Sequence, residues 1–444
     1  MNAHRFHVAA MTALLLLVVT GEMATAQLNT VFNSIFQTIL TDRLQLSPGE
    51  HKNHYVPAAA QAESLLAPSL NGLIVSNINS FPLNSTTPGV SFDFSGGQLV
   101  TVQEGAGPIF ADRATTIGKG RFNVGFNATY LDMSRVRGVA TDQMRFSFTH
   151  EDVNGDGVLG GADAEASTEA DVIDVNMGMS LTAQIFAFYA AYGITRNLDV
   201  GVAIPLIHIH MSGTATATIN SFTYANTGRA SHFFGGTADN PILETTVPYD
   251  ESASGIGDVV LRLKYCFLRG SALDLGFLAD VRFPTGREED FLGSGKADAI
   301  FAVLFSKKIV DFTPHLNLGY EVRKADFQSD RVIVRAGFDQ RILQGLTFAG
   351  DFLGTIDVNQ SEAIKLYPGT VTIVEAGNNS GQVARTVRLS NIPDSDNDNL
   401  YNVSVGMKYS PWQGALFLAN MLVPLNQAGL RASVAPTLGV SVDF

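Results

Sequence analysis

The sequence predicts an all-β fold, a transmembrane antiparallel up-and-down β-barrel of about twelve strands with a partly helical N-terminal plug or periplasmic segment. Three observations predict it. Hydrophobic residues make up 45% of the chain and charged residues 16%, against roughly 25% charged in soluble domains. No run of about 18 apolar residues follows the N-terminus, so a membrane-spanning chain must close its sheet to satisfy its backbone groups. Alternating segments fill the C-terminal three quarters. The competing fold is a large soluble all-β protein.

The N-terminus has the pattern of a secretory signal peptide, residues 1–26. A short basic region contains His4, Arg5 and His7. The apolar run 8–19 and the small residues at 24–26 follow, so we expect the mature chain to begin at Gln27. Cys266 is the single cysteine. An exported protein without an intrachain disulfide needs another source of stability, and a closed sheet supplies it.

The C-terminal segment 430–444 alternates between apolar and polar residues over fifteen positions, as a half-buried strand does. The apolar positions are Leu430, Ala432, Val434, Leu438, Val440, Val442 and Phe444. Here the chain resembles bacterial outer-membrane barrels, whose last strand ends in Phe. That resemblance implies that Phe444 is an assembly signal and that the barrel-assembly machinery is a partner.

Eleven further alternating segments precede this strand, so the barrel is expected over residues 121–444. They lie near 121–130, 175–189, 198–206, 259–267, 273–283, 297–307, 312–323, 331–341, 345–357, 402–410 and 414–424. If residues 90–116 or 366–390 also joined the wall, the count would be fourteen.

The connections between these segments fall into two classes. Those near 193–197, 268–272, 308–311, 341–345 and 410–414 are short. The intervening ones are mostly long and polar, near 131–172, 218–255, 285–296 and 358–401, and only 324–330 and 425–429 are short. Short turns on the periplasmic side and longer loops outside are typical of outer-membrane barrels. An even strand number places both barrel termini in the periplasm.

The strand face opposite the apolar one carries charges, which a membrane tolerates only beside partners or water. We therefore expect these residues to line the lumen. They are Asp258, Arg262, Lys264, Asp274, Asp280, Arg282, Asp298, His315, Glu321, Arg335, Asp339, Asp351 and Lys408. Two interpretations stay open: a structural ion network that stiffens the wall, or a pathway for solutes.

Residues 27–120 lack the barrel pattern and form the N-terminal plug or periplasmic segment. An apolar stripe at helical spacing contains Val31, Phe32, Ile35, Phe36, Ile39, Leu40 and Leu44, and 57–66 predicts a second short helix. A twelve-stranded barrel has room for a plug, and a flexible tether is the alternative. Because an apolar stripe suits a charged lumen poorly, we expect the first helix at or just below the periplasmic opening, with 81–116 leading into the lumen.

The order of several phrases resembles the MetA-pathway phenol-degradation family of outer-membrane proteins. The matching stretches are GPIFADRATTIGKGRFNVG (107–125), YGITRNLDVGVAIPL (192–206), GIGDVVLRLKYCFL (255–268), LADVRFPTG (278–286) and GSGKAD (293–298). The resemblance covers about 107–323. That family is similar to the long-chain fatty-acid transporters of the outer membrane, which implies passage of small hydrophobic molecules.

The first long loop contains a possible calcium site. Oxygen ligands at positions 1, 3, 5, 7 and 12 of a twelve-residue loop come from Asp152, Asn154, Asp156, the Val158 carbonyl and Asp163. Gly157 stands where such loops turn sharply. This resembles an EF-hand or dockerin loop, and Ca²⁺ is the only cofactor we expect; the alternative is a solvated Gly/Asp-rich loop. Asp394, Asp396 and Asp398 form a second, weaker candidate.

These features predict a passive, monomeric channel for small hydrophobic or aromatic solutes in the outer membrane of a Gram-negative-type bacterium. Its expected partners are membrane lipid and the solute, with no nucleic acid. The rival is a non-transporting structural or surface-interaction barrel. A membrane-embedded hydrolase is a more distant alternative, because His208 and His210 share the outward parity with Ser212. We expect no enzyme, since the sequence shows no assembled Ser, His and orienting group.

Overall fold

A computed structural model describes residues 27–47, 55–79, 91–95, 98–102, 107–153, 155–161, 166–270, 272–325, 328–358, 364–376, 382–412 and 414–444. The expected signal peptide lies outside these residues. Within them, no helix has both the length and the apolar character needed to cross a membrane.

Among the described residues, twelve antiparallel strands close into a barrel, because β25 pairs with β4 and β8 pairs with both β4 and β9. In chain order they are β4 (Phe122–Val136), β8 (Val172–Gly193), β9 (Leu198–Asn220), β14 (Val259–Arg269), β15 (Asp274–Phe283), β16 (Asp298–Ser306), β17 (Phe312–Val322), β18 (Arg331–Leu343), β19 (Leu346–Asp357), β22 (Leu400–Tyr409), β23 (Ala415–Pro424) and β25 (Ala435–Asp443). This confirms the predicted fold and strand count.

The segments that could have raised the count pair elsewhere. Strands β2 (Ser91–Ser95) and β3 (Gln98–Val102) pair with each other. Strand β20 (Thr370–Ala376) pairs with β21 (Gln382–Arg388) and with β7 (Leu159–Gly161). None of the five extends the barrel wall.

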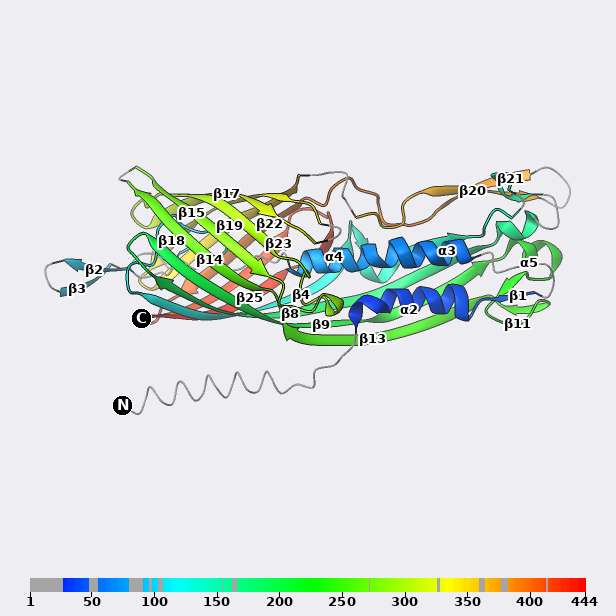
Figure 1. The fold of residues 1–444 in the computed structure, drawn as a ribbon, viewed down its shortest axis with the longest axis horizontal. Coiled ribbons are helices and arrows are strands. Elements are labelled where there is room, and N and C mark those ends of the chain that lie inside the picture. The colour runs from blue at the N-terminus through cyan, green and yellow to red at the C-terminus, as the bar shows by residue number, and fades with distance from the viewer. Residues whose placement is uncertain are drawn as a thin grey trace, which may run out of the picture.

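The short turns gather at one end of the barrel. The turn 194–197 follows β8 and the turn 410–414 follows β22, and both lie at the end where the chain terminates (Figure 1). There Phe444 donates its N–H to the Phe122 carbonyl at 2.8 Å and accepts one in return at 3.1 Å. The two turns therefore share the end that holds both barrel termini, as predicted.

The outward face of the barrel carries a belt of exposed apolar side chains, while the inward face is mostly buried. Belt members include Phe122, Val202, Ile204, Leu261, Leu263, Phe301, Val303, Leu318, Val405, Phe417 and Val440. On β9 the belt runs from Val200 to Leu206 and then gives way to His208, His210 and Ser212. About nine to eleven residues cross a bilayer as a tilted strand, so 207–220 of β9 project beyond the lipid.

This projection forms a second structural unit. Strands β13 (Glu244–Ile256) and β6 (Met144–Thr149) pair with the far parts of β9 and β8 and widen them into a four-stranded sheet. The apolar residues that mark the second predicted strand, from Val175 to Ile185, face inward here and are buried in a core rather than exposed to lipid.

The N-terminal helices fill the concave side of this sheet. They are η1 (Leu28–Thr30), α2 (Val31–Gln37), η2 (Thr38–Asp42), α3 (Val56–Gln61), η3 (Ala62–Leu66) and α4 (Ala67–Asn79). The Phe36 ring lies 6.2 Å from the Phe146 ring and 5.6 Å from the Phe148 ring. Arg43 donates to the Thr246 carbonyl at 2.9 Å.

The predicted position of these helices at the periplasmic opening is wrong, although the predicted helices themselves form. They lie at the end opposite the C-terminus, beside β13 and β9 (Figure 1). The reason is that the long loops and the projecting sheet offer an apolar surface, which the sequence pattern of charged inward positions did not reveal. The stripe from Val31 to Leu40 buries against that surface.

The remaining elements are short. They are β1 (Gln45–Leu46), β5 (Val139–Ala140), η4 (Thr141–Gln143), η5 (Ala166–Ala170), α5 (Phe222–Thr227), β10 (His232–Phe233), β11 (Gly235–Thr237), β12 (Asn240–Ile242), η6 (Glu288–Asp290) and β24 (Leu430–Ala432). Strand β24 continues the wall beside the outer part of β4.

Candidate functional site: the barrel lumen

A segment of the chain crosses the lumen in its periplasmic half. We call residues 107–117, which precede β4, the lumen segment. Its polar groups bond to inward side chains of β9, β14, β16, β17, β18, β19 and β22. A segment that contacts seven of twelve strands must lie across the lumen. It therefore obstructs a passage along the barrel axis.

Asp112 anchors the segment to one side of the wall. Its carboxylate lies 3.2 Å from Arg262 Nη1 and 3.3 Å from Lys264 Nζ. Arg262 also makes two bonds of 2.7 Å to Asp280. The Asp112 backbone bonds twice to the Asn317 amide, each at 2.7 Å. These charges are almost fully buried, so each depends on its partners to offset lost hydration.

A second set of contacts holds the other part of the segment. Arg113 forms a fully buried ion pair with Asp339. Asp351 accepts the Phe110 N–H at 2.9 Å and also bonds to His315 Nε2 at 2.8 Å. Lys408 Nζ donates to the Pro108 carbonyl at 2.6 Å. Both backbone and side-chain groups of the segment thus form hydrogen bonds or ion pairs with side chains of the barrel wall.

Two inward glycines make room for the segment. A Cβ at Gly276 would lie 2.9 Å from the Ala114 carbonyl oxygen, and one at Gly406 would lie 2.7 Å from the Ile109 side chain. A larger residue at either position would push the segment away from the wall.

The thirteen residues expected to line the lumen lie on the described strands or at their ends, and the structure divides them by contact. Arg262, Lys264, Arg335, Asp339, Asp351 and Lys408 bond to the lumen segment directly. Arg262, Arg335, Asp280, Arg282, Asp298 and Glu321 line a cavity. His315 bonds to Asp351. Asp258 instead holds the loop after β15 through Ser294, and Asp274 begins β15 opposite Arg269.

The cavity lies on the outer side of the lumen segment, has a volume of about 120 Å³ and is partly open to solvent. One side is apolar, with Leu131, Met133, Leu353, Leu422 and Leu430, and the other carries the charged residues above. Asn77, in α4, lines its outer end. There Ser76 accepts a bond of 3.0 Å from Arg323. Helix α4 thus borders the outer end of the cavity, and two of the lining residues, Arg262 and Arg335, bond to the lumen segment.

Asp112 and Arg113 were not predicted as site residues from the sequence. The available signal was a pair of opposite charges inside an otherwise apolar stretch, in a segment without strand alternation. The sequence predicted that 81–116 lead into the lumen, but it predicted no contact for any residue there.

A family model described as the putative MetA-pathway of phenol degradation matches residues 159–410. The chain belongs to this family. The phenol-degradation family resemblance stated from the sequence is therefore confirmed, and the protein lies in the outer membrane of a Gram-negative bacterium, in contact with its lipid.

Similar solved structures are also outer-membrane barrels. The COG4313 outer membrane channel of Pseudomonas putida F1 is 11% identical, with 74% of this chain and 98% of that chain covered and a TM-score of 0.40. A Pseudomonas aeruginosa FadL homologue is 9% identical, with 73% and 90% covered and a TM-score of 0.32. The Ralstonia pickettii toluene transporter TbuX is 12% identical, with 73% and 89% covered and a TM-score of 0.26. No curated protein matches the chain.

The calcium loop is only partly described. Asn154 and Asp163 lie outside the described residues. Asp152 accepts the N–H groups of Gly155 and Gly157, each at 2.8 Å, and Asp156 accepts that of Val158 at 2.8 Å. In the part of the chain that the structure describes, no group of three or more acidic, His or Cys side chains is placed to hold a metal.

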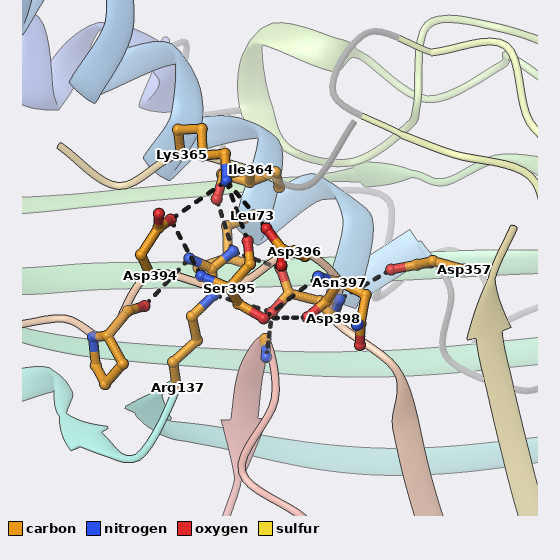
Figure 2. A network of polar contacts seen from close by, with 12 residues as sticks. Leu73, Arg137, Asp357, Ile364, Lys365, Asp394, Ser395, Asp396, Asn397 and Asp398 are labelled. Carbon is orange, nitrogen blue, oxygen red and sulfur yellow. Dashed lines mark hydrogen bonds and ion pairs between the residues drawn. The ribbon is translucent and has the colours of Figure 1, made fainter. Parts of the chain in front are cut away.

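The second acidic cluster forms ion pairs with basic residues instead (Figure 2). Arg137 makes two bonds to Asp398, at 3.0 and 2.8 Å, and one of 2.6 Å to the Ile364 carbonyl. Lys365 lies 3.4 Å from Asp394 and 3.9 Å from Asp396. The two cations offset part of the charge of the three carboxylates and fasten the external loops to one another.

The two outward histidines of β9 take part in separate pairs. His208 Nδ1 lies 2.7 Å from Ser254 Oγ, and His210 Nε2 lies 2.8 Å from Asp250 Oδ1. Both pairs join β9 to β13 beyond the apolar belt. Ser212 is opposite Asp250 in the register.

Proposed function

We propose that the protein is a passive outer-membrane channel for small hydrophobic or aromatic solutes. The observation that carries the proposal is the half-apolar cavity inside the barrel, separated from the periplasm by the lumen segment. Apolar surface inside a lumen gains free energy from burying an apolar solute, at about 25 cal/mol per Å². A purely structural wall has no need for such a cavity. The family description, which names phenol degradation, agrees with this solute class.

The proposed route has three parts. A solute enters beside α4, where Asn77 and the Arg323–Ser76 contact mark the outer end of the cavity. It then rests against Leu131, Leu353 and their neighbours. It leaves when the lumen segment moves away from the periplasmic half of the wall. No step uses a catalytic residue, and the concentration gradient drives net movement.

Uptake of N-phenyl-1-naphthylamine by cells with an intact outer membrane tests the proposal. This small aromatic probe fluoresces on reaching lipid and is normally excluded. Cells that express the full chain should brighten several-fold faster than cells without it. Leu353→Asp should remove the increase, because it places a charge on the apolar side of the cavity, whereas Ile342→Asp, at the exposed end of β18, should not.

Both variants must reach the outer membrane in wild-type amounts, which heat-modifiable migration on gels measures. If the wild-type chain leaves uptake unchanged while fully assembled, the non-transporting, structural function replaces the channel.

A further inference from the structure

We propose that the cavity selects small organic anions, above all aromatic carboxylates, and binds them in one orientation. This inference rests on the proposed channel function and names the solute class within it. The apolar body would lie against the leucine-lined side, and the carboxylate would face Arg282 and Arg335.

The two sides of the cavity come from different halves of the barrel. Apolar lining residues are contributed mainly by β4, β19, β22, β23 and β24, which are neighbours around one half. Most charged lining residues come from β14, β15, β16, β17 and β18, which are neighbours around the other half. The exception is Arg431, which lies on β24. A solute that touches both halves must itself have a polar and an apolar side.

The sign of the polar group follows from which charges are already paired. Arg262 and Asp280 neutralise each other through two bonds of 2.7 Å. Among the described residues, Arg282 and Arg335 form no ion pair within 4.0 Å, and neither does Arg431. Two carboxylates, Asp298 and Glu321, remain on the same side of the cavity. On that side the two carboxylates equal Arg282 and Arg335 in number, and Asp298 is opposite Arg282 in the strand register. Arg431 on β24 adds a third cation from across the cavity, so the cavity as a whole has one excess positive charge that a carboxylate would neutralise.

Arginine also suits the geometry of a carboxylate. Its planar guanidinium presents parallel N–H donors that match two carboxylate oxygens. Arg335 donates one bond, of 3.2 Å, to the Phe110 carbonyl of the lumen segment. A carboxylate bound at Arg335 would compete for that donor. Solute binding would therefore loosen one contact of the segment that blocks the exit.

Calorimetric titration of the full-length protein in detergent with three probes tests this inference. Benzoate supplies both features, benzyl alcohol keeps the ring without the charge, and acetate keeps the charge without the ring. We expect benzoate to bind at least tenfold more tightly than either of the others. Arg282→Gln and Arg335→Gln should each weaken benzoate binding about tenfold and leave benzyl alcohol unchanged.

Matched variants separate charge from folding. Arg335→Lys should recover part of the benzoate affinity, and Arg229→Gln, on an exposed external loop, should have no effect. Equal binding of benzoate and benzyl alcohol by the wild-type protein, or unchanged benzoate binding in both glutamine variants, would overturn the anion preference. In that outcome uptake of the neutral naphthylamine probe would still support the channel. Loss of that uptake as well would instead reject the channel.

Discussion

The contact between Asp112 and its two cations gives the sharpest prediction, because it fastens the lumen segment to the wall. Asp112→Asn keeps the side chain's size and removes its charge. The Asp112 and Lys264 side chains are each 2% exposed, and the distances to Arg262 and Lys264 are 3.2 and 3.3 Å. Removing one partner of a buried ion pair costs about 3–5 kcal/mol, since the other charge stays buried.

The lower figure of about 3 kcal/mol shifts an equilibrium by roughly 100-fold, at 1.4 kcal/mol for each factor of ten. Arg262 keeps Asp280 as a partner, so the lower figure is the appropriate one. The ratio of displaced to seated lumen segment should therefore rise about 100-fold. In planar bilayers, Asp112→Asn should show frequent opening events that the wild-type protein shows rarely.

The matched control is Asp311→Asn, which breaks an ion pair with Arg341 at a periplasmic turn. These side chains are 38% and 33% exposed, and exposed pairs contribute about 0–1 kcal/mol. We expect wild-type conductance from this variant. If Asp112→Asn also conducts like the wild type while folded, the pair does not hold the segment closed, and the gating role is refuted.

Three further predictions concern other parts of the molecule. For the first external loop, we expect calcium to protect against protease cutting between residues 150 and 165, and Asp156→Ala to remove the protection; equal cutting with and without calcium would leave only a solvated loop. In the second structural unit, formed by the projecting sheet, the N-terminal helices and the long loops, burial raises the pKa of Tyr55 well above 10 and that of Tyr367 to about 12. The folded state thus keeps protons that the unfolded chain releases near pH 10, so stability should fall as pH rises from 10 to 12; absorbance at 295 nm reports the ionisation, and full ionisation by pH 10.5 in the folded protein would contradict the shift. For assembly, Phe444→Ala should lower the fraction of heat-modifiable barrel several-fold while Phe417→Ala does not, and equal fractions would remove the signal role of Phe444.

The barrel wall could be predicted from the sequence because each strand is determined by residues that are close together in the chain. Each strand alternates between lipid and lumen, and the order of residues within a strand records this directly, as from Val259 to Phe267. The alternation of short turns and long loops then oriented the barrel. These patterns depend on neighbours in the chain, so a single sequence suffices.

The placement of the N-terminal residues depends on contacts between distant segments, which no local pattern records. The stripe from Val31 to Leu40 predicted a helix with a buried face, yet its partners, Phe146 and Phe148, lie more than 100 positions away. Likewise, nothing near Asp112 in the sequence indicates Arg262 or Lys264. The sequence identified the charged inward positions. Only the closed structure shows which of them contact the lumen segment, the cavity or a loop.

A disulfide that locks the lumen segment tests whether this segment controls solute passage. The Ala114 N–H donates to Ser306 Oγ at 3.0 Å, so Ala114→Cys with Ser306→Cys, in a Cys266→Ser background, puts one cysteine on the segment and one on β16 where the two meet. The rate of N-phenyl-1-naphthylamine uptake would be measured before and after reduction. If the segment controls passage, the oxidised protein should show background uptake and the reduced protein wild-type uptake. Equal uptake in both states would show that the segment does not control passage.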